Sequence, residues 1–381
     1  MNPAVTATGG SLIRALNARK KPSSIDLGLG EPTLGPNLAH FEYATEWVAQ
    51  HGCHYTTNVG DPELRAAIAQ HYRYPALSKA ENVCITTGSQ EALYVTIKTM
   101  LDPANDELLL VEPAFSVYDK IADVEGITVR RVSMPEGTGF AFDAGRIIDA
   151  LTPRTRMILI CSPCNPTGRV IDRPAAVALA KALGERSGPP VYVLHDEIYR
   201  ELSYTSQGAD IAEFYPYTIA INSLSKSNAL TGLRIGWLMA PSDVVGELAK
   251  VHSWTSSCAS TFGQVVAKRI FADNELGAQR AWYAAQQLVA TSAAQAAGLT
   301  FIQPEGAFYL CLRIGVEDDV NFGYRLVDEE DVVAIPGSNF GATLRGWLRT
   351  SFVAPEATLR EGYARIASLA ARCRTAASST S

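Results

Sequence analysis

A lysine placed among small hydroxyl residues is the first residue of the chain to suggest chemistry. In SLSKSNALTGLRIGW (residues 223–237), Lys226 follows an apolar run, and Arg234 lies eight residues after it. An amine is nucleophilic only in its neutral form, which burial or neighbouring cations favour. Arg234 together with a phosphate would create a mixed charged setting around Lys226. Most lysines are simply solvated surface charges, so other parts of the chain must decide between the two interpretations.

A second stretch has the composition of an anion site. TTGSQEAL (86–93) places Gly88, Ser89 and Gln90 between an expected strand and an expected helix. Backbone N–H groups at a helix start, a glycine that permits close approach and a serine hydroxyl suit a phosphate group. Turns that contain Gly-Ser also occur without a ligand, so this motif alone is weak.

Two further apolar runs end in polar residues. SPCNPTG (162–168) contains Asn165 before a proline, a pair that also occurs in simple turns. YVLHDEIYREL (192–202) leads into Asp196, with Tyr199 three residues later. A carboxylate at the end of a buried strand loses hydration unless a cation or a hydrogen-bond donor meets it. We therefore expect a partner near Asp196, the alternative being an exposed acid at a strand end.

Short apolar runs alternate with amphipathic stretches over much of the chain. We expect strands over 81–87, 107–113, 127–134, 156–163, 190–197 and 217–225, and helices over 89–101, 173–188 and 241–254. This alternation predicts an α/β fold whose mostly parallel sheet is covered by helices on both faces. Such sheets bind ligands at the carboxyl ends of their strands, which is where the polar residues accumulate.

The pattern changes near residue 275, where a long Ala/Gln-rich helical stretch (277–298) leads into mixed strands and helices. We expect three parts in a chain of 381 residues: an N-terminal arm that also contributes to the small domain (1–44), a large domain (45–276) and a smaller α/β C-terminal domain (277–381). The tail at 378–381 is expected to fray.

The composition excludes several classes of protein. Hydrophobic residues make up 47% of the chain without a run long enough to span a bilayer, which predicts a globular protein with no membrane segment. The net charge of -6, with scattered Lys and Arg, shows no nucleic-acid footprint. The first residues lack the order of a secretory signal, so we expect a cytoplasmic protein.

The cysteines do not indicate a disulfide framework or a metal centre. Seven cysteines at irregular spacing suit a reducing compartment. Cys161 and Cys164 form the pattern CSPC, but no second Cys or His pair accompanies it, and the neighbouring Pro163 and Asn165 indicate a loop at a strand end. We therefore expect no metal site.

The order of these motifs resembles one family over nearly the whole chain. LGLGEPTLGP (27–36), YTTNVGDPELRAAI (55–68), VEPAFSVY (111–118), SPCNPTG, HDEIY, SLSK and LRTSF (348–352) occur in the order found in class I/II aminotransferases of the aspartate aminotransferase superfamily. The resemblance implies fold type I and pyridoxal 5'-phosphate (PLP) as cofactor. It also implies that Lys226 is the lysine that forms a Schiff base with PLP.

The resemblance assigns roles to residues around the cofactor ring. Asp196 would pair with the pyridinium nitrogen and keep it protonated, so that the ring accepts electrons from the substrate α-carbon. Tyr199 and Asn165 would contact the phenolic oxygen of the cofactor. Phe115, in PAFSVY, stands where many relatives carry Tyr or Trp stacked on the ring. Lys226 would also move a proton between the α-carbon and the cofactor.

The resemblance also implies how the phosphate is held. Arg234 would supply a charge-assisted hydrogen bond, with further contacts from Gly88, Ser89, Gln90 and Ser223. Gln90 departs from the lysine, glutamate or threonine that relatives carry. Tyr55 resembles the tyrosine that reaches the phosphate of the neighbouring subunit, which implies a homodimer.

Substrate binding is implied by two residues. Arg349, in LRTSF, matches the arginine that grips the substrate α-carboxylate, and Gly30 matches the glycine whose backbone approaches the same group. No second arginine is placed to bind a dicarboxylate side chain, so aspartate as substrate is not supported. Tyr55, Phe115 and WTSSCAST (254–261) instead favour an apolar or an uncharged polar side chain.

Three classes of function remain open at this point. The leading hypothesis is an aminotransferase that exchanges an amino group between an L-amino acid and a 2-oxo acid. A C–S β-lyase, or a synthase or cyclase that modifies amino acids, would use the same Lys226 and Asp196, because only the surroundings select the reaction. A non-enzymatic regulator would need an added DNA-binding module, for which 381 residues leave no room.

Overall fold

A seven-stranded sheet forms the centre of the large part of the chain. The computed structural model describes residues 1–378, so the expected fraying of the tail falls outside the described residues from 379 onward. The strand order is β2-β8-β7-β6-β5-β3-β4, and only β8 runs antiparallel to its neighbours. The strands are β2 (Val83–Thr86), β3 (Glu107–Glu112), β4 (Thr128–Ser133), β5 (Thr155–Cys161), β6 (Tyr192–Asp196), β7 (Thr218–Ser223) and β8 (Gly236–Met239).

Helices cover both faces of this sheet because its central strands are apolar on both sides. In β3, Leu108 and Leu110 pack toward one face and Leu109 and Val111 toward the other. The first face carries α5 (Ser89–Met100), α6 (Val117–Val124) and α10 (Ser242–Ser256). The second face carries α4 (Pro62–Tyr72), α7 (Ala144–Ala150), α8 (Arg173–Gly184) and α11 (Thr261–Ala272). The expected α/β fold with a mostly parallel sheet is confirmed.

The C-terminal part is built on a four-stranded antiparallel sheet of order β12-β13-β10-β9. Its strands are β9 (Thr300–Phe301), β10 (Tyr309–Arg313), β12 (Ile335–Pro336) and β13 (Trp347–Ser351), and its helices are α12 (Arg280–Ala296), α13 (Asp319–Glu330) and α14 (Glu356–Ser378). Near the N-terminus, α1 (Pro3–Ala7) and α2 (Leu12–Asn17) precede β1 (Ile25–Asp26), which pairs with β11 (Val332–Val333). The start of the chain is therefore hydrogen-bonded, through the β1–β11 pair, to the C-terminal part.

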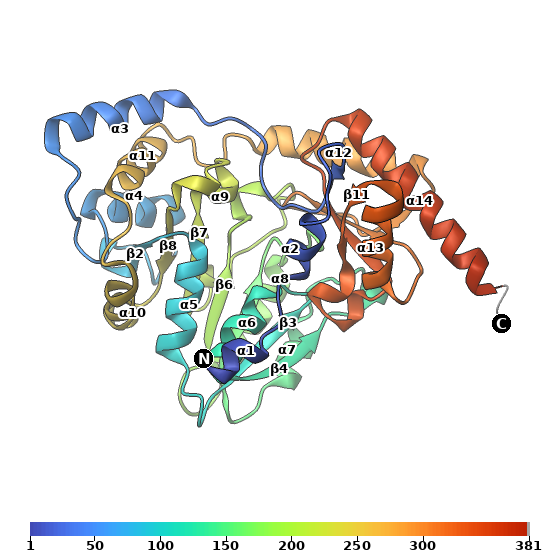
Figure 1. The fold of residues 1–381 in the computed structure, drawn as a ribbon. Helices are drawn as coiled ribbons and strands as arrows, with labels where there is room; N and C mark the ends of the chain where they lie inside the picture. Colours follow the sequence, from blue (N-terminus) through green and yellow to red (C-terminus); the bar gives the residue numbers. More distant parts are fainter. Residues whose placement is uncertain (379–381) are drawn as a thin grey trace.

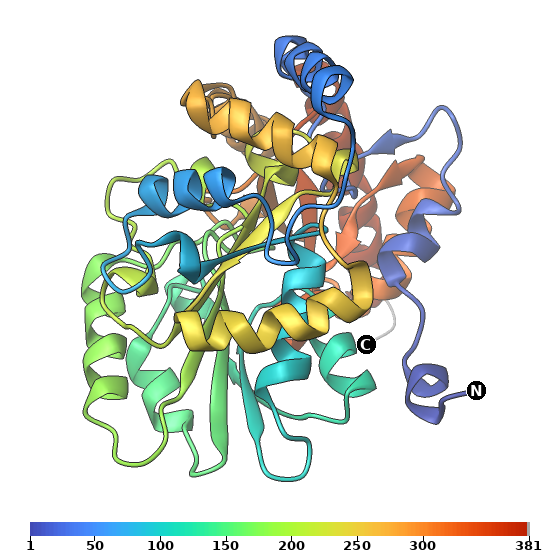
Figure 2. The same cartoon turned by 90° about the vertical axis from the view of Figure 1, so that its left-hand side faces the viewer.

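The helix α3 (Leu38–His51) bears on where the N-terminal arm ends. It packs along α11 at one end of the molecule, opposite α13 and α14 (Figure 1), and the same pair lies along the top of Figure 2. A boundary between residues 44 and 45 would cut this helix. We retain the three-part division as a proposal, with all of α3 assigned to the large domain and the second boundary kept at 276/277.

Two features complete the description. The strand β8 was not among the expected strands, because its four residues GWLM overlap the end of the Lys226 motif. Among the helices of residues 1–378, none is both long and apolar enough to cross a membrane.

Candidate active site

A cavity of about 300 Å³ lies at the carboxyl ends of the central strands, between the two sheets. Residues of the N-terminal segment, the large sheet and the C-terminal sheet all reach it. Ten of the residues selected from the sequence line it, namely Gly30, Ser89, Gln90, Phe115, Asn165, Asp196, Tyr199, Lys226, Arg234 and Arg349. Seven stretches that are separate in sequence therefore meet where parallel sheets place ligand sites.

Lys226 lies on the single-turn helix α9 (Leu224–Ser227), which follows β7 directly. The turn begins at Ser223, whose hydroxyl accepts a hydrogen bond from the Ser225 N–H at 3.1 Å. The Lys226 amine donates to the Gly30 carbonyl oxygen. Burial, and after it the positive charge of Arg349, lowers the pKa of Lys226 to about 8. Roughly a tenth of the amines are thus neutral at pH 7, far more than for a lysine in water.

Asp196 ends β6 and is buried, with 5% of its surface exposed. Its Oδ2 accepts a hydrogen bond from the Tyr118 hydroxyl at 2.7 Å, and its Oδ1 accepts one from the Ile198 N–H at 3.2 Å. Burial raises the pKa of the Asp196 carboxyl, whereas both hydrogen bonds and the charge of Lys226 oppose that rise. The carboxylate is therefore poised to bind a cationic group from the cavity.

Arg349 is buried at the centre of β13, and its side chain contacts both the large domain and the N-terminal segment. One terminal nitrogen donates to Asn165 Oδ1 at 3.1 Å, and the other donates to the Gly28 carbonyl oxygen. The guanidinium also lies over the Tyr309 ring, 4.4 Å from its centre. Its buried Nε has no hydrogen-bond partner among the described residues. A buried guanidinium with a free donor, at the edge of a cavity, can bind a carboxylate.

A compact anion cradle forms the other end of the cavity. Gly88 has φ 83°, a conformation that favours glycine, and a Cβ there would lie 2.4 Å from the Arg234 Nη2. The helix α5 begins at the next residue, Ser89, so the free N–H groups of its first turn lie near the Arg234 guanidinium. Arg234 donates to the carbonyl oxygens of Thr231 and Thr87 at 2.9 and 3.3 Å. This arrangement fits a phosphate group.

Three of the residues selected from the sequence do not line the cavity. Gly88 lies behind Arg234, as described above. Ser223 is fully buried, its hydroxyl caps α9, and Ser225 lines the cavity instead. Tyr55 is 87% exposed in the single chain. The cavity roles of Ser223 and Tyr55 stay predictions that rest on the resemblance.

Several lining residues were not selected from the sequence. Tyr118 lies three residues after Phe115, one turn along the same motif, and that helical spacing was the available signal. Tyr309, from the C-terminal sheet, exchanges a hydrogen bond of 2.8 Å with the Tyr199 hydroxyl. Ile13 and Leu29 close the cavity from the N-terminal segment. No local pattern distinguishes such apolar residues from ordinary core residues.

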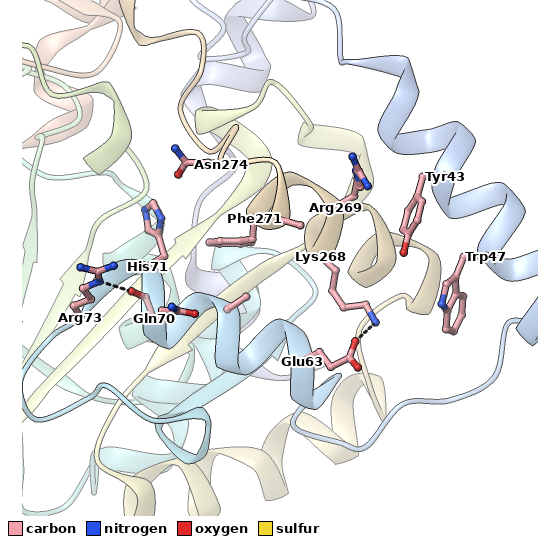
Figure 3. Close-up of a pocket in the computed structure, with 12 residues that line it drawn as sticks. Tyr43, Trp47, Glu63, Gln70, His71, Arg73, Lys268, Arg269, Phe271 and Asn274 are labelled. Carbon is pink, nitrogen blue, oxygen red and sulfur yellow. Dashed lines mark hydrogen bonds and ion pairs between the residues drawn. The ribbon is translucent and has the colours of Figure 1, made fainter.

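A larger hollow of about 800 Å³ lies elsewhere, between α3, α4 and α11. Figure 3 shows Tyr43 and Trp47 of α3 facing α11, with Lys268 directed toward Glu63. That amine is ion-paired with Glu63 at 3.0 Å and with Asp61 at 3.1 Å. None of the residues selected from the sequence lines this hollow, and its lysine has its charge partners. Size alone therefore does not mark the active site.

Comparison with known proteins identifies the family. Residues 22–366 match the family described as aminotransferase class I and II. The chain belongs to the class I and II aminotransferase family. Members of this family use PLP.

Relatives of the aminotransferase cover almost its whole length. It is 31% identical to an aspartate aminotransferase of Pyrococcus horikoshii over 93% of both chains. It is 32% identical to a probable N-acetyl-LL-diaminopimelate aminotransferase of Bacillus subtilis over 90% of this chain and 88% of the relative. A solved mutant of Thermus thermophilus aspartate aminotransferase superposes with a TM-score of 0.89 at 29% identity, covering 97% and 99% of the two chains.

These relatives confirm the leading hypothesis from the sequence. The protein is an aminotransferase, and its substrates are small molecules, namely amino acids and oxo acids. The lyase and synthase alternatives are not favoured, because the relatives named above are all aminotransferases.

The lowered pKa of Lys226 predicts unusual reactivity in the cofactor-free protein. Below pH 8 the neutral fraction of this amine should exceed that of an ordinary lysine roughly 300-fold. We expect carbamylation of Lys226 by cyanate to rise through a midpoint near pH 8. Peptide mass spectrometry would follow labelling of Lys226 relative to exposed lysines such as Lys181 in the same sample, which cancels changes in the reagent. A constant ratio across pH 6–10 would contradict the burial argument.

Proposed function

We propose that this aminotransferase holds PLP through Lys226 and transfers the amino group of a neutral L-amino acid to a 2-oxo acid. The observation that carries the proposal is a buried amine of lowered pKa, set between a buried carboxylate, Asp196, and an incompletely bonded guanidinium, Arg349. The anion cradle at Gly88 and Arg234 fits the cofactor phosphate. When bound, PLP would act as the electron sink for the bond broken at the substrate α-carbon.

The residues around the cavity would each contact a different part of the cofactor. Asp196 would bind the protonated ring nitrogen, which gives its buried charge a cationic partner. Tyr199 and Asn165 would hold the phenolic oxygen, and Phe115 would lie against the ring face. Lys226 would hold the cofactor and then carry a proton at its Nζ, since its amine titrates near neutral pH.

The phosphate and the substrate would be held at opposite ends of the cavity. Ser89, Gln90 and Ser223 would support the phosphate beside Arg234. Arg349 would bind the α-carboxylate, with Gly30 approaching it through its backbone. The Gly30 carbonyl oxygen already contacts the Lys226 amine, which supports a substrate position beside that amine.

The charges that line the cavity favour a substrate with an uncharged side chain. Lys226, Arg234 and Arg349 are the cations of this lining. In the proposal Lys226 holds PLP, Arg234 binds its phosphate and Arg349 binds the substrate α-carboxylate. Glu31 approaches from the rim, where its carboxylate accepts a hydrogen bond from Thr231 at 2.6 Å. A second substrate carboxylate would meet Glu31 and the apolar Ile13 and Leu29 rather than a free cation.

Two broader parts of the proposal rest on different features. We propose a homodimer in which the exposed Tyr55 reaches the phosphate of the neighbouring subunit, since a tyrosine 87% exposed is unusual without a partner. We also propose a cytoplasmic location, because the seven cysteines are all free, as a reducing compartment requires.

The test of function is a half-reaction screen followed by absorbance between about 300 and 500 nm. Purified protein loaded with PLP would receive single amino acids that include leucine, methionine, phenylalanine, glutamine, aspartate and glutamate. We expect neutral amino acids to bleach the cofactor band and a 2-oxo acid to restore it. Lys226→Ala is the control that should abolish turnover. Faster bleaching by aspartate than by every neutral amino acid would overturn the substrate class, and recovery with release of ammonia would overturn transamination.

Gly88→Ala tests the anion cradle. Its Cβ would meet Arg234 and would occupy a backbone conformation that costs a non-glycine residue about 1–3 kcal/mol. We expect PLP affinity to fall about tenfold or more, as measured by equilibrium dialysis of the variant. Gly246→Ala, on α10 where a Cβ meets open space, is the matched control. Equal affinities in the two variants would remove Gly88 from the phosphate site.

Tyr118→Phe tests the support of Asp196. A hydrogen bond to a charged group contributes about 1.5–3 kcal/mol, so we expect the half-reaction to slow roughly 10- to 100-fold while the fold persists. Loss of the bond also raises the pKa of Asp196 further, so the acidic limb of the pH–rate profile should move to higher pH. Tyr217→Phe, at an exposed tyrosine, is the control. An unchanged rate and pH profile in Tyr118→Phe would contradict this support.

A further inference from the structure

Three potential metal ligands meet outside the active site, where α3 contacts the connection between α11 and α12. The His40 Nε2 lies 3.4 Å from Asp273 Oδ2 and 3.3 Å from Glu275 Oε2. The ligand atoms of all three residues lie within 4.8 Å of one another. One imidazole and two carboxylates are a donor set that suits divalent transition metals, zinc among them.

The histidine of this cluster is buried and lacks a hydrogen bond at the nitrogen that faces the carboxylates. His40 is 3% exposed, and its Nε2 makes no hydrogen bond within the described residues despite the two nearby oxygens. A buried polar atom without a partner is destabilising, and native structures rarely keep one. A cation between His40, Asp273 and Glu275 would satisfy this nitrogen through its lone pair.

Two of the distances between ligand atoms agree with a tetrahedral metal site. Zinc binds nitrogen and carboxylate oxygen at about 2.0–2.1 Å in a tetrahedral arrangement, which separates neighbouring ligand atoms by about 3.3 Å. Magnesium, with octahedral ligands at about 2.1 Å, would separate them by only about 3.0 Å. The observed separations of 3.3 and 3.4 Å match the tetrahedral value. We propose that His40, Asp273 and Glu275 form a structural zinc site.

The surroundings provide the outer contacts and the fourth position that such a site needs. Arg269 contacts both oxygens of the Asp273 carboxylate at 2.7 Å, and Asn37 donates to Glu275 Oε2 at 3.1 Å, so both ligands are fixed in orientation. Each facing oxygen would share its lone pairs between this donor and the metal. His40 and Glu275 also line a cavity of about 260 Å³, which has room for water as a fourth ligand. The Gln279 Oε1 beside this cavity is buried and has no hydrogen-bond partner in the described part of the chain.

A second cluster of similar composition has a different geometry and different partners. His195, Glu197 and Asp210 also lie close together. There the Tyr74 hydroxyl already bridges the two carboxylates, at 2.6 Å from Glu197 and 2.9 Å from Asp210. Arg200, whose Nε lies 2.6 Å from Asp210, supplies the positive charge. Among residues 1–378, His195 also lacks hydrogen bonds at both ring nitrogens, but its Nδ1 lies 2.9 Å from Glu197 Oε1, closer than the separation of about 3.3 Å between tetrahedral zinc ligands.

The zinc site would hold α3 to the connection that follows α11 rather than act in the reaction. His40 belongs to α3, whereas Asp273 and Glu275 follow α11. The Glu275 carbonyl oxygen also accepts a hydrogen bond of 2.9 Å from Asn228, two residues beyond Lys226. Binding a metal to the folded state alone stabilises that state, so zinc should raise the melting temperature while leaving the half-reaction unchanged.

The test uses the PLP-loaded protein, without a histidine tag and after dialysis against a chelator, at pH 8. Zinc chloride would be titrated by calorimetry, and bound metal would be counted by plasma mass spectrometry. We expect one zinc per chain and a raised melting temperature. His40→Gln and Glu275→Gln should each lower the affinity at least tenfold. His51→Gln, at an exposed histidine of the same helix, should bind like the parent protein.

Each other outcome would overturn the proposal. If no zinc binds, His40 forms only an ion pair with the two carboxylates. If His40→Gln and Glu275→Gln bind zinc like the parent, the metal is held by cysteines such as the exposed Cys53. Circular dichroism of both variants establishes that they are folded, so loss of binding in a folded variant supports the site. The assay does not depend on which amino acid is the substrate.

Discussion

Burial of the Lys226 amine is the constraint on which the active site depends. A lysine in water stays protonated at neutral pH and can neither attack a carbonyl carbon nor accept a proton. Here burial and the nearby Arg349 lower its pKa to about 8, while Asp196 and Glu31 act in the opposite direction. The amine therefore lies close to the balance between its charged and neutral forms. Proton transfer in both directions requires this balance.

The fold creates this environment by bringing distant segments to one edge of a sheet. Parallel strands β5, β6 and β7 end side by side, so Asp196 and Lys226 approach each other without any local sequence relation. The C-terminal sheet adds Arg349 and Tyr309, and the N-terminal segment adds Gly30 through β1, which pairs with β11. Each segment alone would leave a buried charge without a partner, so the site forms only when the whole chain folds.

Sequence reasoning predicted the parts of this arrangement that local patterns encode. The alternation of apolar runs and amphipathic helices was sufficient for the α/β fold, and the ordered motifs selected ten residues that line the cavity. Tyr309 was not found, because its role arises from contact with Tyr199, 110 positions earlier in the chain. The cluster of His40, Asp273 and Glu275 likewise joins residues distant in sequence, which local spacing does not reveal. Ser223, by contrast, was selected from its motif, but its hydroxyl caps the helix α9 instead of lining the cavity.

Arg349 connects substrate binding to the basicity of Lys226. In the cavity without substrate, its guanidinium is the largest charged contribution that lowers the pKa of the lysine. A substrate carboxylate bound to Arg349 would offset that positive charge, and the Lys226 amine would then hold a proton more strongly. The same carboxylate would satisfy the unpaired Nε of Arg349 and compete with Asn165 Oδ1 for one of its terminal nitrogens. In the proposed function, the group that recognises the amino acid thus also prepares the lysine to accept its α-proton, so binding and proton transfer are coupled through one buried charge.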